Sequence, residues 1–470
     1  MFAITTFSIP IFGSVVALIT DRYAPKIRNF FVVLIALATL VSALATIPMA
    51  SKTQVFMLGP LSFPGFNLSF IVDGLGVYVA VMSSLIGFLI VLYSLGYMKE
   101  YAHQGEYYFL VILFLGAMMG LVLSANLLLI YIFWEITAIC SWRLIGFYRD
   151  PQHLRNADTA LMMTVFGSFF MLIGIETIWH DAGTLVITGI RGHTVSNMAF
   201  FFIFIGILAK SAQVPLQVWL PAAGVAPSPV TALLHAAVLV VIGVFAFARI
   251  FVGTFNLPVN WQIATSAVAT VTILVAGASA IVEKNAKRIL AYSTLGQLGY
   301  VYLGLASMTQ IGIAGGLVFL LAHSFAKAGL FLCVGIIEKR THTRDITELG
   351  GLIHSMPWTT AAFIACSLTI IGFPPTAGFF GKLMIVMGSF EAVPSLFGML
   401  AIAGGVVTIV YMLRLFNSVF LGEKRWIDLR EGDPVMIGTV IAFAVVSIII
   451  GFGAQPLLDI VQAMVTQIFS

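Results

Sequence analysis

The segment Ala209-Lys-Ser-Ala-Gln-Val-Pro-Leu-Gln-Val-Trp219 combines a lysine and a proline with apolar residues. It ends an apolar run over residues 198–220, and a run of about 20 such residues can cross a bilayer as a helix. A lysine inside the run is costly, and Pro215 removes a backbone hydrogen bond close to it. Broken helices at membrane depth occur inside protein or beside water, and they are common in transporters. The stretch therefore predicts a transmembrane helix that is broken next to a buried lysine.

Comparable apolar runs recur along the chain. It has 470 residues, of which 60% are hydrophobic and 9% charged, whereas about a quarter of the residues of a soluble domain are charged. The runs are continuous and do not alternate with a period of two, so they favour helices over the strands of a β-barrel. We therefore predict an all-α polytopic membrane protein with about fourteen transmembrane helices. The spans lie at roughly 2–20, 27–48, 74–97, 107–125, 126–148, 157–179, 198–220, 228–250, 263–282, 288–306, 311–338, 359–386, 396–421 and 435–461.

A second broken helix is predicted at Gly372-Phe-Pro-Pro-Thr-Ala-Gly-Phe-Phe-Gly-Lys382, where prolines again interrupt a span with a lone lysine. In the order of the spans this helix 12 follows helix 7 by five helices, which suggests two inverted five-helix repeats. We divide the chain into helices 1–3 over residues 1–106, a first repeat (helices 4–8) over 107–250, a second repeat (helices 9–13) over 263–421 and helix 14 over 435–470.

The loops differ in charge. Lys and Arg concentrate in the loops that follow odd-numbered helices, for example Arg22, Lys99, Lys284, Lys287 and Lys339. Few follow even-numbered helices, and one of these, Arg249, is expected at a helix end. Because basic loops are retained on the cytoplasmic side, both termini are expected on the outer side. We expect a multi-pass protein of the cell (inner) membrane.

Several ionisable side chains remain inside the predicted spans, where each costs at least about 2.5–3.5 kcal/mol on insertion scales. His323 and Lys327 are four residues apart and therefore share one helix face. For Glu135 the alternative is a structural ion pair, and for Lys382 it is snorkelling to the interface. We interpret the set as a proton pathway. Its candidate residues are Glu135, Lys210, His235, His323, Lys327 and Lys382.

Other functional classes lack a signal in the sequence. The net charge of +4 is too small to give the basic surface that binds nucleic acid. Cys140, Cys333 and Cys366 lie in apolar runs, and their spacing matches no metal or iron–sulfur motif. No glycine-rich nucleotide motif or haem-binding histidine pair is present. We therefore expect no cofactor, no metal and no catalytic redox site in this chain, so any energy for pumping must come from an ion gradient or from partner subunits.

Taken together, these motifs resemble one family. They are similar to the proton-conducting antiporter-like subunits of respiratory complex I, and most of all to the largest of these subunits. The same family includes subunits of Mrp-type Na⁺/H⁺ antiporters and of membrane-bound hydrogenases. The segments that carry the resemblance are Phe133-Trp-Glu-Ile-Thr137, Lys210-Ser-Ala-Gln213, Ala226-Pro-Ser-Pro-Val-Thr-Ala-Leu-Leu-His235, Leu290-Ala-Tyr-Ser-Thr-Leu-Gly-Gln-Leu-Gly-Tyr300, His323-Ser-Phe-Ala-Lys327 and Gly372–Lys382.

The resemblance implies fourteen helices, two inverted repeats and broken helices 7 and 12. It also implies that Glu135 and Lys210 are the paired charges of an input half-channel, that His235 links the half-channels, and that Lys382 is the exit lysine. Two positions depart from complex I. Ser168 stands where those relatives often have an aspartate, and Arg143 is a candidate modulator that we expect to pair with Glu135 or an acidic partner.

We predict a proton-translocating membrane subunit of a complex I-related assembly, of the NADH-quinone oxidoreductase or membrane-bound hydrogenase type. Its partners would be other integral-membrane subunits, a peripheral redox arm, the lipid bilayer, and protons or Na⁺. One alternative is a subunit of an Mrp-type Na⁺/H⁺ antiporter without a redox partner. Another is a membrane module of an ion-coupled inorganic-carbon uptake complex.

Overall fold

The computed structural model describes residues 2–63, 66–193, 196–255, 257–392, 394–426 and 429–469. The chain is mostly helical, as predicted. It forms two compact units. Unit 1 comprises Met1–Val91, Met98–Ser211 and Ala237–Leu257, and unit 2 comprises Leu92–Tyr97, Ala212–Ala236 and Pro258–Ser470.

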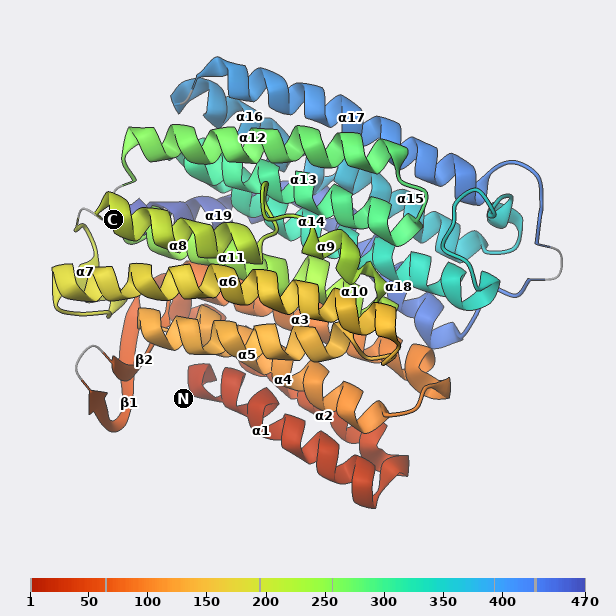
Figure 1. Ribbon diagram of the computed structural model, residues 1–470, viewed down its shortest axis with the longest axis horizontal. Helices are drawn as coiled ribbons and strands as arrows, with labels where there is room; N and C mark the ends of the chain where they lie inside the picture. The colour runs from red at the N-terminus through yellow and green to blue at the C-terminus, as the bar shows by residue number, and fades with distance from the viewer. Residues whose placement is uncertain are drawn as a thin grey trace. The chain divides into compact units, whose positions relative to one another are not determined.

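Unit 1 is built from long helices with one hairpin at their ends (Figure 1). Its elements are α1 (Phe2–Tyr23), α2 (Pro25–Leu44), β1 (Gln54–Phe63), β2 (Phe66–Val72), most of α3 (Gly74–Tyr97), α4 (Gln104–Val122), α5 (Leu127–Ile145), α6 (Pro151–Ala182), α7 (Ile187–Ile190), α8 (Asn197–Lys210) and α11 (Leu239–Phe247).

The hairpin of β1 and β2 was not predicted. Its strands pair antiparallel, with Gln54 opposite Val72 and Phe56 opposite Phe70. The second strand also bonds to the loop between α4 and α5, because Ile71 N donates to the carbonyl of Leu123 at 2.7 Å. The segment between the second and third spans is thus ordered structure outside the helices.

Unit 2 contains the rest of the chain (Figure 1). Its elements are α9 (Trp219–Ala222), α10 (Ser228–Ala232), α12 (Val259–Val282), α13 (Ala286–Ala306), α14 (Gln310–Thr341), α15 (Pro357–Ile371), α16 (Ala377–Ala392), α17 (Ser395–Phe420), α18 (Pro434–Phe452) and α19 (Ala454–Phe469). The predicted last span, 435–461, is divided at Gly453 between α18 and α19.

Side-chain caps fix where several helices begin. Asn126 accepts from the backbone N–H groups at the start of α5, and Asp150 does the same for α6. In unit 2, Asn285 caps α13 and Thr309 caps α14. These residues satisfy N–H groups that have no partner within the helix, so they end each loop at a defined residue.

Both predicted helix breaks are present. The span 198–220 is divided into α8 and α9, and the span 359–386 into α15 and α16. Each gap contains prolines, and the Val214–Pro215 and Pro374–Pro375 peptide bonds are cis. A third interruption was not predicted. The span 228–250 includes π-helical segments at Leu233–Ala237 and Ala248–Val252, and the first of them contains His235.

The number of membrane spans differs from the prediction. Within the described residues, 11 helices are long and apolar enough to cross a membrane. The two broken spans fall outside this set because their pieces are short. The predicted span 288–306 forms α13, but it is also outside the set because it carries polar side chains such as Ser293 and Gln297. The structure confirms the helical membrane fold and both breaks, but not the count of fourteen.

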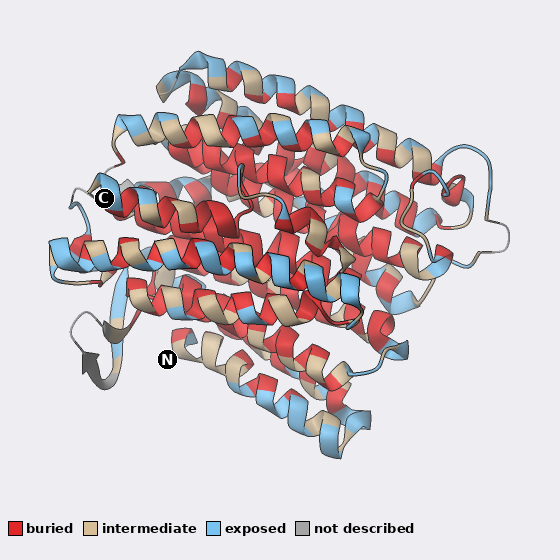
Figure 2. Ribbon diagram, viewed as in Figure 1, coloured by how far each residue is buried: buried red, intermediate tan, exposed pale blue. Residues whose placement is uncertain are grey.

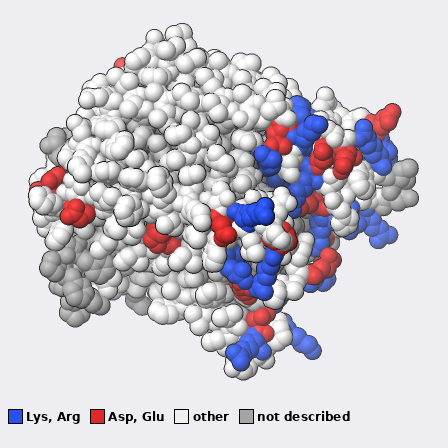
Figure 3. Space-filling view, in the orientation of Figure 1, with Lys and Arg blue, Asp and Glu red and all other residues white. Residues whose placement is uncertain are grey.

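Burial varies strongly within unit 2. Figure 2 shows α14 buried along nearly its whole length, whereas α17 is exposed on one side. The exposed side chains of α17 are apolar, among them Met399, Val406 and Leu413. Figure 3 shows a broad area of surface without charged side chains. Such a surface suits a helix flank that faces lipid or another membrane subunit.

Candidate functional site

Lys210 is the last residue of α8, and its side chain is completely buried in unit 1. Its Nζ donates to the backbone carbonyl of Trp134 on α5 at 3.1 Å. The same Nζ lies 5.1 Å from the centre of the Trp134 ring, on its negative face. The lysine at the break is therefore anchored to the segment that carries the acidic candidate.

Glu135 directly follows Trp134 in the chain and is half-buried. It interacts electrostatically with Lys210. The ion pairs found among the described residues do not join the two, and the Oε1 atom of Glu135 is buried without a hydrogen-bond partner. The predicted partners are therefore close enough to influence each other, but they do not form a salt bridge here.

Ser168 on α6 holds the indole of Trp134. Its Oγ accepts from the indole Nε1–H at 3.1 Å and donates to the carbonyl of Thr164 at 2.9 Å. The residue that departs from the complex I pattern thus acts on Lys210 through Trp134. A neutral hydroxyl at this position adds no charge beside the lysine.

Three further candidates lie together in unit 2. His235 is in the π-helical segment, and His323 and Lys327 are on α14; all three side chains are completely buried. Lys327 interacts electrostatically with both imidazoles, and its Nζ donates to the carbonyl of Leu290 at 3.1 Å. The ring of His235 lies 4.4 Å from that of Phe331, one turn after Lys327. The ring nitrogens of His235 have no hydrogen-bond partner in the described chain, and the ring of His323 lies against the backbone of His235.

Lys382 lies on α16, after the second break, and is half-buried. Its Nζ donates to the carbonyls of Ile370 at 2.7 Å and Ile371 at 3.4 Å. These carbonyls end α15, where the break leaves them without helical partners and the helix dipole is negative. Lys382 also interacts electrostatically with Lys327. Unit 2 thus brings together His235, His323, Lys327 and Lys382.

Arg143 was expected to pair either with Glu135 or with another acidic partner, and the structure shows the second. The partner is Glu106 on α4 and not Glu135, and Arg149 binds the second carboxylate oxygen of Glu106 at 2.5 Å. Arg143 lies eight residues after Glu135, slightly more than two turns further along α5.

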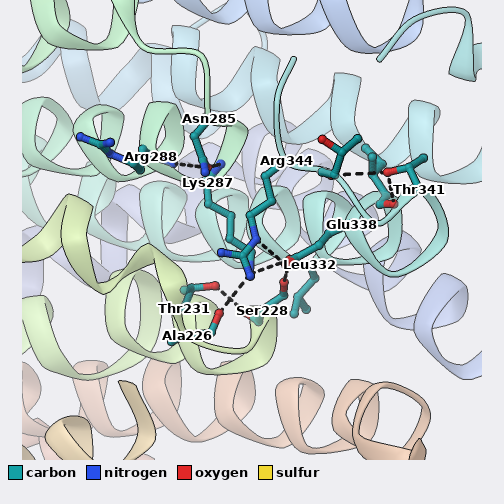
Figure 4. A network of polar contacts seen from close by, with 12 residues as sticks. Ala226, Ser228, Thr231, Asn285, Lys287, Arg288, Leu332, Glu338, Thr341 and Arg344 are labelled. Carbon is teal, nitrogen blue, oxygen red and sulfur yellow. Dashed lines mark hydrogen bonds and ion pairs between the residues drawn. The ribbon is translucent and has the colours of Figure 1, made fainter. Parts of the chain in front are cut away.

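A buried ionic network in unit 2 was missed from the sequence (Figure 4). Lys287, assigned to a basic loop, is completely buried, and its Nζ lies 2.7 Å from Glu338. It also donates to the carbonyl of Ala226 at 3.0 Å, while Ser228 donates to Glu338 at 3.1 Å. Arg344 completes the set around Glu338. The network joins the starts of α10 and α13 to the end of α14.

A second missed pair lies in unit 1. Asp73 precedes α3 and accepts from the N–H of Gly76, as expected of a capping residue, but it also pairs with Arg249. Both side chains are largely buried. From the sequence, Arg249 is expected at a helix end, and the structure has it in the second π-helical segment.

The described residues contain no group of three or more His, Cys, Asp or Glu side chains that could hold a metal. The candidate residues are titratable side chains in two clusters, one in each unit. Buried amines, imidazoles and carboxylates are groups that can gain and lose protons.

The sequence of this chain matches known protein families. Residues 124–408, more than half of the chain, match the family described as NADH:quinone oxidoreductase/Mrp antiporter, transmembrane. The chain belongs to this family. Residues 62–108 match a second family, described as the N-terminus of NADH-ubiquinone oxidoreductase (complex I) chain 5.

Curated relatives are Na⁺/H⁺ antiporter subunits A1. That of Staphylococcus saprophyticus is 35% identical over 82% of this chain and 52% of its own length. That of Staphylococcus aureus is 31% identical over 95% of this chain and 60% of its own length. The chain thus spans little more than half of the curated relatives that it matches.

Two solved structures share the fold. A chain in the Mrp complex from Dietzia sp. DQ12-45-1b has a TM-score of 0.91 at 22% identity, covering 100% of this chain and 98% of that one. A chain in the membrane-bound sulfane sulfur reductase, an archaeal respiratory membrane complex, has a TM-score of 0.91 at 23% identity, covering 99% and 97%. This protein is a multi-pass, antiporter-like membrane protein.

Proposed function

We propose that this chain conducts protons as a subunit of an Mrp-type Na⁺/H⁺ antiporter in the cell membrane. Protons would pass from Glu135 and Lys210 through His235, His323 and Lys327 to Lys382. Arg143 would modulate the first step through its position on α5. The two inverted repeats and the outer location of both termini belong to the same proposal.

One observation carries the proposal. The ammonium of Lys210 is completely buried at a helix break and hydrogen-bonded to the residue before Glu135. A charge buried in this way is expensive unless it serves a function. Since no salt bridge ties the lysine to Glu135, it can lose and regain a proton without breaking one.

The choice of the antiporter over a redox-driven pump rests on the curated relatives, whose names give them as Na⁺/H⁺ antiporter subunits. A redox-linked assembly is the second candidate, and the fold shared with the sulfane sulfur reductase favours it. Purification of the native complex in mild detergent separates the two. Flavin or iron–sulfur subunits would indicate the redox assembly, and small membrane subunits alone would indicate the antiporter.

Transport is tested with the whole complex in everted membrane vesicles, where addition of Na⁺ collapses a preformed pH gradient. Lys210→Met and Glu135→Gln are each expected to abolish this collapse while the complex still assembles. Lys26→Met, which neutralises an exposed lysine in the first turn of α2, is the matched control. If both pathway variants transport as well as the control, the proposed pathway is wrong.

A further inference from the structure

A column of polar side chains runs between α13 and α17 in unit 2. On α13, Ser293, Gln297 and Tyr300 follow one another at spacings of four and three residues, so they share one face. On α17, Thr408 and Tyr411 are three residues apart. All five side chains are buried. The pathway described above does not use any of them.

Tyr411 is the centre of this column. Its hydroxyl lies 2.7 Å from Oγ of Ser293 and accepts from Nε2 of Gln297 at 3.1 Å. The same Nε2 donates to the hydroxyl of Thr408 at 3.4 Å. Tyr411 also interacts electrostatically with Tyr300. The hydroxyl and amide groups therefore follow one another closely along the column.

The amide of Gln297 is incompletely bonded. Its Oε1 atom is buried and has no hydrogen-bond partner in the described chain. Exchanging the oxygen and nitrogen of the amide would only leave the other end without a partner. Because buried polar groups are almost always bonded to protein or to ordered water, this Oε1 atom is an acceptor available to a water molecule that enters the column.

The column reaches Lys382 at one end. Nζ of Lys382 lies 4.8 Å from the ring centre of Tyr300, whose hydroxyl donates to the carbonyl of Ala401 at 2.6 Å. At the other end, Arg414 follows Tyr411 by one turn of α17 and donates to the carbonyl of Glu283 at 2.7 Å. From residue 401 to residue 414 the helix rises about 20 Å.

The Glu283 end lies at the surface. Glu283 ends α12 and pairs with Arg288 at 3.1 Å, and the side chain of Arg288 is exposed. The loop that contains Lys284 is one of the basic loops of the sequence. The column therefore extends from the surface at Glu283 to the half-buried Lys382.

We propose that this column is a second proton route, which links the surface at Glu283 to Lys382 without His235, His323 or Lys327. The inference rests on the proposed function insofar as Lys382 carries protons. A proton from the surface moves by exchange, each water or hydroxyl accepting one proton and passing another on. It ends on the neutral amine of Lys382, and release reverses the sequence.

Water access is tested first, because it does not depend on transport. Gln297→Cys and the matched variant Leu298→Cys place a thiol on the column and on its buried neighbour in α13. The intact complex in vesicles is treated with a small water-soluble methanethiosulfonate, and the parent protein, whose three cysteines are buried, gives the background. We expect Gln297→Cys to react about tenfold faster or more, a difference in barrier of about 1.4 kcal/mol. Equal rates would overturn the proposal.

Transport is tested with Tyr411→Phe, which removes the central hydroxyl and keeps the ring. Tyr93→Phe is the control, because it also removes a buried hydroxyl that donates to a carbonyl, that of Leu332 at 2.9 Å. We expect Tyr411→Phe to lower the transport rate about tenfold relative to this control. A rate equal to that of Tyr93→Phe would show that the column carries no protons.

The two proposals can fail separately. If Lys210→Met abolishes transport while Tyr411→Phe does not, the column is excluded and the main pathway stands. If Lys210→Met transports normally, the main pathway fails. In that case selective labelling of Gln297→Cys would still support water access to the column.

Discussion

Trp134 binds Lys210 in two ways, because it offers the ammonium both a carbonyl at 3.1 Å and a ring face at 5.1 Å. A buried amine usually needs a carboxylate in contact or a full set of hydrogen bonds. Here the stabilisation comes from a neutral side chain and a backbone oxygen. Neither of these groups accepts or releases a proton. The protonation of Lys210 can therefore respond to Glu135, which follows Trp134 in the chain.

The ring face of Trp134 is expected to matter for transport. Trp134→Leu keeps the carbonyl but removes a cation–π interaction worth about 2 kcal/mol when desolvated, and transport should fall roughly 30-fold. Trp134→Phe keeps an aromatic face and should lose much less. The measurement is Na⁺-driven collapse of a pH gradient at matched complex levels. Equal rates for the two variants would show that the ring face has no such role.

Ser168 positions the ring of Trp134, so removing the hydroxyl of Ser168 should lower the free energy of unfolding. Ser168→Ala leaves the buried Nε1–H of Trp134 without its acceptor, and we expect a cost of about 1–3 kcal/mol. Ser141→Ala is the control, because the buried hydroxyl of Ser141 bonds only to the carbonyl of Ala138 within its own helix. Thermal unfolding of the purified complex checks the difference. Equal melting temperatures would contradict the assigned hydrogen bond.

The sequence predicted the breaks and the buried amines because these depend on local chemistry. Pro215 and the prolines before Lys382 interrupt a helix wherever it packs, and a lysine in an apolar run must be buried or reach an interface. The π-helical segment at His235 was not predictable in this way. It contains no proline or glycine, so nothing in Leu233–Ala237 marks the extra residue in the turn.

Ion pairs between distant residues were the hardest part to predict. Lys287 appeared to belong to a loop because Lys284 and Arg288 flank it, and the structure shows that it lies at the start of a helix and is buried against Glu338. Arg249 was likewise assigned to a helix end, and its partner Asp73 is 176 residues away. Such pairs depend on which helices are neighbours, which one sequence does not reveal.

The Asp73–Arg249 pair should contribute far more to stability than the Glu106–Arg143 pair. Asp73→Ala leaves a buried guanidinium without its counter-charge, and we expect a loss of about 3–5 kcal/mol. Glu106→Ala removes a partly exposed carboxylate and should cost about 1 kcal/mol or less. Adding Arg249→Met to Asp73→Ala should restore most of the loss. If it restores none, the pair is not the reason for the loss.

The same pair predicts a dependence of stability on acid. Asp73 lies outside the span that begins at Gly74, and its burial alone would raise the pKa of its carboxyl. Three interactions outweigh burial: the positive charge of Arg249, the hydrogen bonds that Arg249 donates to Asp73, and the hydrogen bond from the N–H of Gly76. Together they hold the pKa of Asp73 below its ordinary value. A carboxyl with a lowered folded-state pKa stabilises the fold fully above the unfolded pKa of about 3.9, and loses this effect as the pH falls through the folded value.

The difference in melting temperature between the parent protein and Asp73→Asn should therefore be constant from neutral pH down to about pH 5 and shrink below about pH 4. Both proteins share every other carboxyl, so their general acid sensitivity cancels in this comparison. The measurement is thermal unfolding of the purified complex across this range of pH. A difference that grows on acidification would mean that folding raises the pKa of the Asp73 carboxyl above its unfolded value, so the charge of Arg249 would not be what stabilises this carboxylate.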